Sequence, residues 1–455
     1  MREMEKKEEE GRRIVIMVPY PAQGHLNPMQ NLAWAFVGMG LEAVIVVPRH
    51  IQRSRPADGD DEMVRWVAVE DGLGGGRAAP PDFFEIEWAM EKWMPSELEK
   101  VVMVEKLKGE VICVVVDLLA SWAIEVASIC GIPCAGFWPA MLATYRLISS
   151  IPHLLQAGLI SHTGLPKEEG ENGVVVSEGP IITTEDLPWL IGTVEAKKGR
   201  FKFWRRSMER SRKLKWLLVN TFPDESREGD GDGDERVIIP ISPIIINSSS
   251  SGGRHRRNSN NKMISLWEED RSCMDWLERK EERSVVYVSF GSWVSPIGEA
   301  RVRSLALALE ATGRPFLWVL RWSQGLPGGF VERNMHSGRG RVVCWAPQRE
   351  ILQHRSVGCY LTHCGWNSTL EALQFRVRQL CYPLAGDQFL NCAYIVQVWK
   401  VGVRLNGFGE RDVHEGLHRV MHDHHMDARL ASLHQAAFIQ PLPPLFNHFL
   451  QQLQP

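Results

Sequence analysis

The sequence lacks the features of several large protein classes. It has no basic excess: 52 lysines and arginines face 55 aspartates and glutamates, and the net charge of −3 argues against nucleic acid or an anionic membrane surface as the main partner. It has no uninterrupted apolar segment of membrane-spanning length, and the N-terminal stretch MREMEKKEEEGRR is charged where a secretory signal is apolar. We therefore expect a cytoplasmic protein without a transmembrane segment.

Paired cysteines and metal motifs are also missing. Nine cysteines lie scattered along the chain, and the absence of a C-x-x-C pair argues against disulfides and zinc. The DGDGDE run at 230–235 has the aspartate spacing of a calcium loop, but Glu235 stands where such a loop has glycine. The sequence His414-Glu-Gly-Leu-His418 matches a zinc-protease motif, although a solvated helix face is the simpler interpretation. We expect no bound metal.

Two apolar runs place candidate functional residues at one edge of a sheet. Residues 13–19 (RIVIMVP) have the β-branched composition of a buried parallel strand, and residues 111–116 form another such strand, which ends at Asp117. His25 lies on the loop after the first strand. Because ligands bind at the carboxyl ends of the strands in an open α/β sheet, we expect His25 and Asp117 at the same ligand-binding edge.

A second series of strands and helices starts at residues 284–290 (SVVYVSF), after a polar, Gly/Ser-rich stretch. The length suits two domains. No G-x-G-x-x-G follows the first strand of either series, so a nicotinamide or flavin oxidoreductase has no fingerprint here. The sequence predicts two doubly wound domains at 12–223 and 266–420, an interdomain linker or insert at 224–265 and an atypical tail at 421–455.

One junction in the second series has the features of an anion-binding site. An apolar run at 357–363 leads into CGWNS (364–368), and a helical pattern follows at once. The first N–H groups of a helix are unpaired and the helix dipole adds positive charge, so a diphosphate would bind well there. Gly365 permits close approach, and Asn367 and Ser368 can cap the helix or donate to phosphate. Taken alone, the junction could also be an ordinary capped turn.

The residues around this junction resemble a known family. Between residues 345 and 388 the chain has W-x-x-Q, H-C-G-W-N-S-x-x-E and D-Q at matching spacings, with PAQGH near residue 23, VNTF at 219–222 and FGS at 290–292. This set is similar to the donor-binding signature of the plant secondary-product UDP-glycosyltransferases (glycosyltransferase family 1). The resemblance implies an α/β GT-B fold, in which two Rossmann-like domains face each other across a cleft. The nucleotide sugar would bind the C-terminal domain and the acceptor mainly the N-terminal domain.

By position, the resemblance also implies a set of donor-binding residues. They are Trp345 for the uracil, Gln348 and Glu371 for the ribose, Ser292, His363, Asn367 and Ser368 for the diphosphate, Trp366, Asp387 and Gln388 for the sugar hydroxyls, and Ala346. A terminal glutamine in this signature resembles the glucose-preferring members. The resemblance therefore implies UDP-glucose as the co-substrate, with no other cofactor.

The same resemblance pairs His25 with Asp117 as the catalytic dyad. A neutral histidine is the usual base for a hydroxyl near pH 7, and a carboxylate on its other ring nitrogen fixes the tautomer. A small hydrophobic acceptor, such as a phenolic, hormone-like or other secondary metabolite, would then attack the sugar in one step with inversion and without a metal. This implies a monomeric UDP-glucose-dependent O-glycosyltransferase.

Two departures from the family pattern leave an alternative open. Arg376 and Arg378 stand where family members have a Gly-Val-Pro turn. The tail is short and interrupted by Pro441, Pro443 and Pro444, whereas the family's last helices brace the N-terminal domain. We therefore expect a strained turn and a less stabilising C-terminus. The alternative hypothesis is a catalytically impaired member that only binds nucleotide sugar or small lipophiles.

Overall fold

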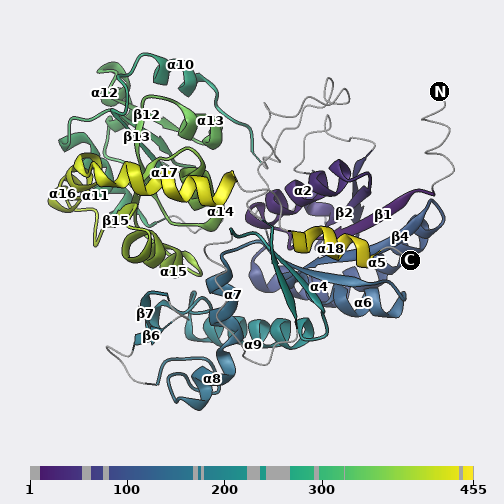
Figure 1. Cartoon of the computed structure of the whole chain (residues 1–455). Helices are drawn as coiled ribbons and strands as arrows, with labels where there is room; N and C mark the ends of the chain where they lie inside the picture. The colour runs from purple at the N-terminus through teal and green to yellow at the C-terminus, as the bar shows by residue number, and fades with distance from the viewer. Residues whose placement is uncertain are drawn as a thin grey trace, which may run out of the picture.

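The structure is a computed structural model of the whole chain. It describes residues 11–53, 63–74, 81–167, 173–175, 179–222, 236–241, 267–291, 297–321, 323–439 and 444–453. Two parallel β-sheets, each with helices packed around it, form two α/β domains (Figure 1). Within the ranges just given, no helix is both long enough and apolar enough to span a membrane.

The N-terminal sheet has seven parallel strands in the order β3-β2-β1-β4-β5-β8-β9. Its Val- and Ile-rich strands are buried on both faces: Ile14 and Ile16 pack into one apolar cluster, and Val15 and Met17 into the cluster on the other face. The strands are β1 (Arg13–Val18), β2 (Glu42–Pro48), β3 (Val64–Val69), β4 (Glu110–Asp117), β5 (Cys134–Trp138), β8 (Trp216–Val219) and β9 (Val237–Pro240).

Helices and a small hairpin surround this sheet. The helices are α2 (Gln23–Gly38), α3 (Arg49–Arg53), α4 (Phe83–Lys92), α5 (Met94–Lys106), η2 (Leu118–Ala120), α6 (Ala123–Ile129), α7 (Leu142–Ser149), α8 (Ile151–Gln156), η3 (Thr184–Asp186) and α9 (Val194–Ser211). The antiparallel hairpin consists of β6 (Gly173–Val175) and β7 (Ile181–Thr183).

The C-terminal sheet has six parallel strands in the order β12-β11-β10-β13-β14-β15. The strands are β10 (Val285–Ser289), β11 (Phe316–Val319), β12 (Gly340–Val343), β13 (Val357–Thr362), β14 (Arg378–Cys381) and β15 (Gly402–Arg404). The helices that follow the linker are α10 (Ser272–Glu278), α11 (Glu299–Ala311), α12 (Phe330–His336), α13 (Gln348–Gln353), α14 (Trp366–Gln374), α15 (Gln388–Ala393), the π-helical turn η5 (Tyr394–Val398), α16 (Glu410–His422), α17 (His425–Phe438) and α18 (Pro444–Gln452).

One strand lies inside the range predicted as a linker. β9 pairs in parallel with β8 and forms an edge of the N-terminal sheet. Ile239 and Ile241 are buried in the core there. The apolar side chains of this short run therefore extend the N-terminal domain, while residues 223–235 and 242–266 lie outside the described residues.

The tail contacts the N-terminal domain, although its prolines led us to expect a less stabilising C-terminus. After α17 the chain returns to the N-terminal domain, where α18 lies beside α2 (Figure 1). Phe446 and Phe449 are fully buried; their rings lie 5.8 Å from the Phe36 ring and 5.6 Å from the Trp216 ring, respectively. Burial of a phenylalanine contributes roughly 1.5–3 kcal/mol. Pro444 begins α18, a position that suits proline; Pro441 and Pro443 lie outside the described residues.

The turn at Arg376 is strained as expected. Arg376 follows α14 with a φ of 54°, in the left-handed region that favours glycine. A non-glycine residue there costs about 1–2 kcal/mol. This cost is smaller than the stabilisation from the two buried phenylalanines of α18.

Arg378 adds contacts where a proline was expected. Its guanidinium is nearly buried and donates to Asp427 on α17 at 3.0 and 2.9 Å and to two carbonyls at the end of α16. Asp427 also accepts two hydrogen bonds from Arg283, both of 2.9 Å. The guanidinium of Arg283 and then that of Arg378 hold the pKa of Asp427 well below its usual range, against the effect of burial. These arginines fasten the tail to the C-terminal sheet.

Candidate active site

A cavity of about 630 Å³ lies where residues from the two domains meet. Its walls come from loops at the carboxyl ends of β1, β5, β10 and β13 and from the first turns of α13, α14 and α15. This is the edge at which open α/β sheets bind ligands. The cavity therefore has an N-terminal wall and a C-terminal wall, built by separate domains.

His25 and Asp117 meet on the N-terminal wall. Nδ1 of His25 lies 2.7 Å from Oδ2 of Asp117, whose carboxylate also accepts from the backbone N–H groups of Tyr20 at 3.3 Å and Leu119 at 2.9 Å. Asp117 is completely buried at the end of β4, and the His25 side chain is 22% exposed and lines the cavity. When Nδ1 donates to the carboxylate, Nε2 carries the lone pair and can accept a proton.

Aromatic and apolar side chains surround the histidine on this wall. They are Phe83, Leu119, Trp138, Pro188 and Trp204. Arg200 also lines the cavity, with its guanidinium carbon 4.1 Å from the centre of the Phe83 ring. Burial lowers the pKa of Arg200. This part of the cavity suits a flat apolar molecule.

A network around Gln348 forms the C-terminal wall. The amide nitrogen of Gln348 donates to Glu371 at 2.7 Å and to the Ser368 hydroxyl at 3.1 Å. Its carbonyl accepts from the hydroxyls of Tyr287 and Tyr360, both at 3.1 Å. Burial raises the pKa of Glu371, and the hydrogen bond from Gln348 acts in the opposite direction. The network fixes the orientation of both residues predicted to hold a ribose.

His363 lies between two glycines at the strand-to-helix junction. A β-carbon at Gly291 would lie 2.6 Å from Nε2 of His363, and one at Gly365 would lie 2.5 Å from it. Side chains at these positions would therefore collide with the ring. Burial lowers the pKa of His363 to about 4, so the ring is neutral at pH 7 and one ring nitrogen can donate to an anion. The N-terminus of α14 begins next to it, at Trp366.

Two side chains of the junction reach across to the N-terminal domain. The indole N–H of Trp366 donates to the carbonyl of Asn220 at 2.7 Å, and its ring stacks on Phe222. The Asn367 amide donates to the carbonyl of Gly24 at 2.8 Å, immediately before the dyad histidine. Both residues line the cavity, but these side-chain donors join the two domains in this structure. Their predicted roles toward sugar and diphosphate remain predictions.

Asp387 and Gln388 stand at the start of α15. The carboxylate of Asp387 accepts from the Asn391 amide at 3.0 Å, and the Gln388 carbonyl accepts from two backbone amides of the preceding turn at 2.9 and 3.1 Å. Burial raises the pKa of Asp387, while the nearby His25 acts in the opposite direction. The predicted sugar-binding carboxylate and the predicted base therefore line the same cavity from different domains.

Most residues predicted from the sequence surround this cavity. The predicted donor-binding residues that line it are Trp345, Ala346, Gln348, His363, Trp366, Asn367, Ser368, Glu371, Asp387 and Gln388. Ser292 lies outside the described residues. Tyr287 and Tyr360 were not predicted. The two tyrosines are register partners on the neighbouring strands β10 and β13. This pairing is the signal from which they could have been predicted.

Comparisons with known proteins assign the family. Residues 242–446 match the family model described as UDP-glucoronosyl and UDP-glucosyl transferase. UDP-glycosyltransferase 82A1 of Arabidopsis thaliana is 49% identical over 444 residues, which cover 93% of this chain and 94% of that protein. The chain belongs to the plant UDP-glycosyltransferase family. A second Arabidopsis relative, UDP-glycosyltransferase 83A1, is 33% identical and the match covers 88% of this chain and 85% of that protein.

Solved structures agree with this family. The crystal structure of Os79 from O. sativa in complex with UDP has a TM-score of 0.80 and 25% identity, covering 96% of this chain and 99% of that chain. UGT71G1 of Medicago truncatula, complexed with UDP-glucose, has a TM-score of 0.76 at 21% identity, covering 96% and 95%. The GT-B fold implied by the sequence is thus confirmed, and the protein is a UDP-glycosyltransferase.

Proposed function

We propose that this glycosyltransferase transfers glucose from UDP-glucose to a hydroxyl of a small hydrophobic acceptor, with inversion and without a metal. The observation that carries the proposal is the His25–Asp117 pair, whose histidine lines the same cavity as Asp387 and Gln388. We place the enzyme in the cytoplasm as a monomer, in line with the sequence.

The dyad would supply the base. Nε2 of His25 takes the proton of the acceptor hydroxyl, and Asp117 stabilises the imidazolium that forms. The acceptor oxygen bonds to the anomeric carbon of the sugar as the bond from that carbon to the diphosphate oxygen breaks. UDP leaves with the electron pair. The proton passes from His25 to solvent, which returns the base to its neutral form.

The C-terminal wall would bind the donor. The Gln348–Glu371 pair offers a carboxylate for ribose hydroxyls, and Trp345 offers a ring for the uracil. The α14 N-terminus and neutral His363 present N–H donors to the diphosphate, and these donors stabilise the negative charge that UDP gains as it leaves. Asp387 and Gln388 would bind glucose hydroxyls.

The N-terminal wall supports the acceptor class. Phe83, Trp138 and Trp204 give an aromatic surface beside His25, which suits a phenolic or similarly flat hydroxylated molecule. The Arg200 guanidinium adds a positive charge on the same wall. Acceptors that carry both a hydroxyl and a negative group are therefore included in the test below.

The test is a screen of purified protein with UDP-glucose and a phenolic library that contains neutral and carboxylate-bearing members. UDP release and a product heavier by one hexose are measured, with His25→Ala as the background. Release well above that background supports the proposal. If UDP binds but no acceptor gives release above background, the result favours the alternative hypothesis of a family member that only binds. A large preference for UDP-galactose over UDP-glucose would overturn the donor assignment.

A further inference from the structure

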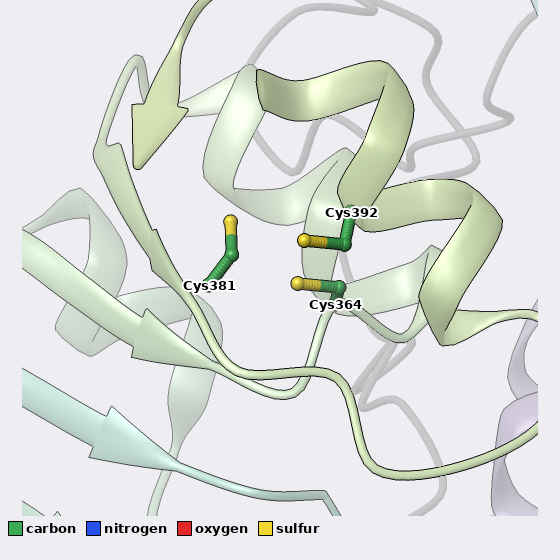
Figure 2. A group of neighbouring side chains, drawn as sticks. All are labelled: Cys364, Cys381 and Cys392. Carbon is green, nitrogen blue, oxygen red and sulfur yellow. The ribbon is translucent and has the colours of Figure 1, made fainter. Parts of the chain in front are cut away.

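Three buried thiols meet directly behind the C-terminal wall (Figure 2). Cys364 belongs to the loop after β13, Cys381 ends β14 and Cys392 lies on α15. Their sulfur atoms all lie within 4.8 Å of one another. Among the residues described, these three form the group whose ligand atoms lie close enough together to hold one metal ion. Three of the nine cysteines, far apart in the sequence, therefore meet in space.

Simple packing does not explain the convergence. A buried free cysteine behaves as a small apolar side chain, and these three belong to the apolar core. An apolar core has no need to bring three sulfurs from three separate elements together. A metal ion bound by three thiolates at a metal–sulfur distance of about 2.3 Å holds its sulfurs roughly 4 Å apart. The observed separations fit that arrangement with small side-chain movements.

We propose that Cys364, Cys381 and Cys392 bind one soft cation, Cu(I), through their sulfur atoms. Soft thiolate ligands select Cu(I) and zinc over harder cations. Zinc in structural sites takes four protein ligands, and the group contains three within the described residues, so the site fits Cu(I) better. Each thiol that binds as a thiolate releases its proton to solvent, and no oxidation or reduction takes place.

The bound cation would brace the donor site. Cys364 stands between His363 and Gly365 with a φ of 65°, and its carbonyl accepts from the Asn391 amide at 2.9 Å. The same amide donates to Asp387 at 3.0 Å. One ion would thus tie together the diphosphate loop, the end of β14 and the helix that carries the sugar-binding pair. Binding should stabilise the folded protein.

The experiment uses full-length reduced protein in which the exposed Cys344 is replaced by Ser, so that this thiol does not compete. Cu(I) is supplied anaerobically as its bicinchoninate complex, and native mass spectrometry counts the ions bound. Cys381→Ala and Cys392→Ala remove ligands. Cys359→Ala is the matched control, since Cys359 is equally buried on β13 and lies outside the group. Circular dichroism and UDP binding verify that each variant is folded.

We expect the parent and Cys359→Ala to take one more Cu(I) than either ligand variant, and Cu(I) to raise their melting temperature by several degrees. Equal uptake by the parent and both ligand variants would overturn the proposal. So would a parent that takes up no Cu(I) but loses two hydrogens on oxidation and regains them with reductant, because the cluster would then be a disulfide-forming pair.

Discussion

The two walls of the cleft are built in different ways. On the N-terminal wall, a buried carboxylate accepts three hydrogen bonds, one of them from the histidine. A single ring nitrogen of that histidine is left for chemistry. On the C-terminal wall, many fixed groups surround the ligand space: an amide–carboxylate–phenol network, a neutral imidazole between glycines and a helix N-terminus. Under the proposed function, the difference means that one wall would move a proton and the other would bind charge that changes during the reaction. Substitutions in the N-terminal wall should therefore lower kcat, and those in the C-terminal wall should raise the donor KM.

The largest effect is expected for His25→Ala. Without the base, kcat should fall roughly 10³-fold or more, since general base catalysis contributes up to about 10⁴-fold. His50→Ala is the matched control: Nδ1 of His50, on α3, lies 2.7 Å from Oδ2 of Asp71, after β3, and neither residue is among those found to line the cavity. Initial rates of UDP release measure both. Equal losses of kcat in the two variants would show that His25 does not act in the chemical step.

A smaller loss is expected for Asp117→Asn. The amide keeps the size of the side chain but no longer fixes the tautomer of His25 or stabilises its imidazolium, so kcat should fall roughly 10²–10⁴-fold with little change in the donor KM. Asp71→Asn serves as control. Wild-type kcat in Asp117→Asn, across the whole pH profile, would contradict the role of the carboxylate.

On the other wall, Glu371→Ala should act mainly on donor binding. Loss of a charge-assisted hydrogen bond costs about 1.5–3 kcal/mol, which corresponds to a rise of roughly 10–100-fold in the KM for UDP-glucose. The acceptor KM should stay near its normal value. A variant whose kcat collapses while its donor KM is unchanged would show that the two walls do not divide the work in this way.

The smallest effect is expected outside both walls, for Asp427→Asn. Its pKa is depressed, so the stabilisation is present above the ordinary aspartate pKa near 4 and is lost as the pH falls further. Because Asp427 is 40% exposed, the loss at pH 7 should be only about 1–2 kcal/mol. Urea unfolding at pH 7 and at pH 3 measures it. Wild-type kcat and donor KM are expected, and a stability difference that grows as the pH falls would contradict this prediction.

The sequence predicted the walls better than the contacts between them. The ends of two buried strands were enough to place His25 and Asp117 on one sheet edge, because parallel strands share that edge. Their 2.7 Å contact depends on the loop after β1, whose path no periodicity specifies. Likewise, the hydrogen bonds from Trp366 and Asn367 to the N-terminal domain depend on how two separately folded units meet.

The tail shows why some predictions were wrong. Three prolines indicated a broken segment, yet Pro444 begins a helix whose phenylalanines are buried in the N-terminal core. The turn is strained at Arg376 as expected, but the sequence did not predict that the Arg378 guanidinium would find partners on α16 and α17. Both outcomes depend on side chains far apart in sequence, and local pattern reasoning does not reach them.

The division of labour between the walls is tested most directly by titrating UDP into His25→Ala in a calorimeter. UDP should bind this variant with a Kd within about twofold of the wild-type value, because the free energy of donor binding comes from the C-terminal wall. A Kd raised tenfold or more, in a variant that remains folded, would show that the N-terminal wall also binds the donor and would contradict the separation of the two roles.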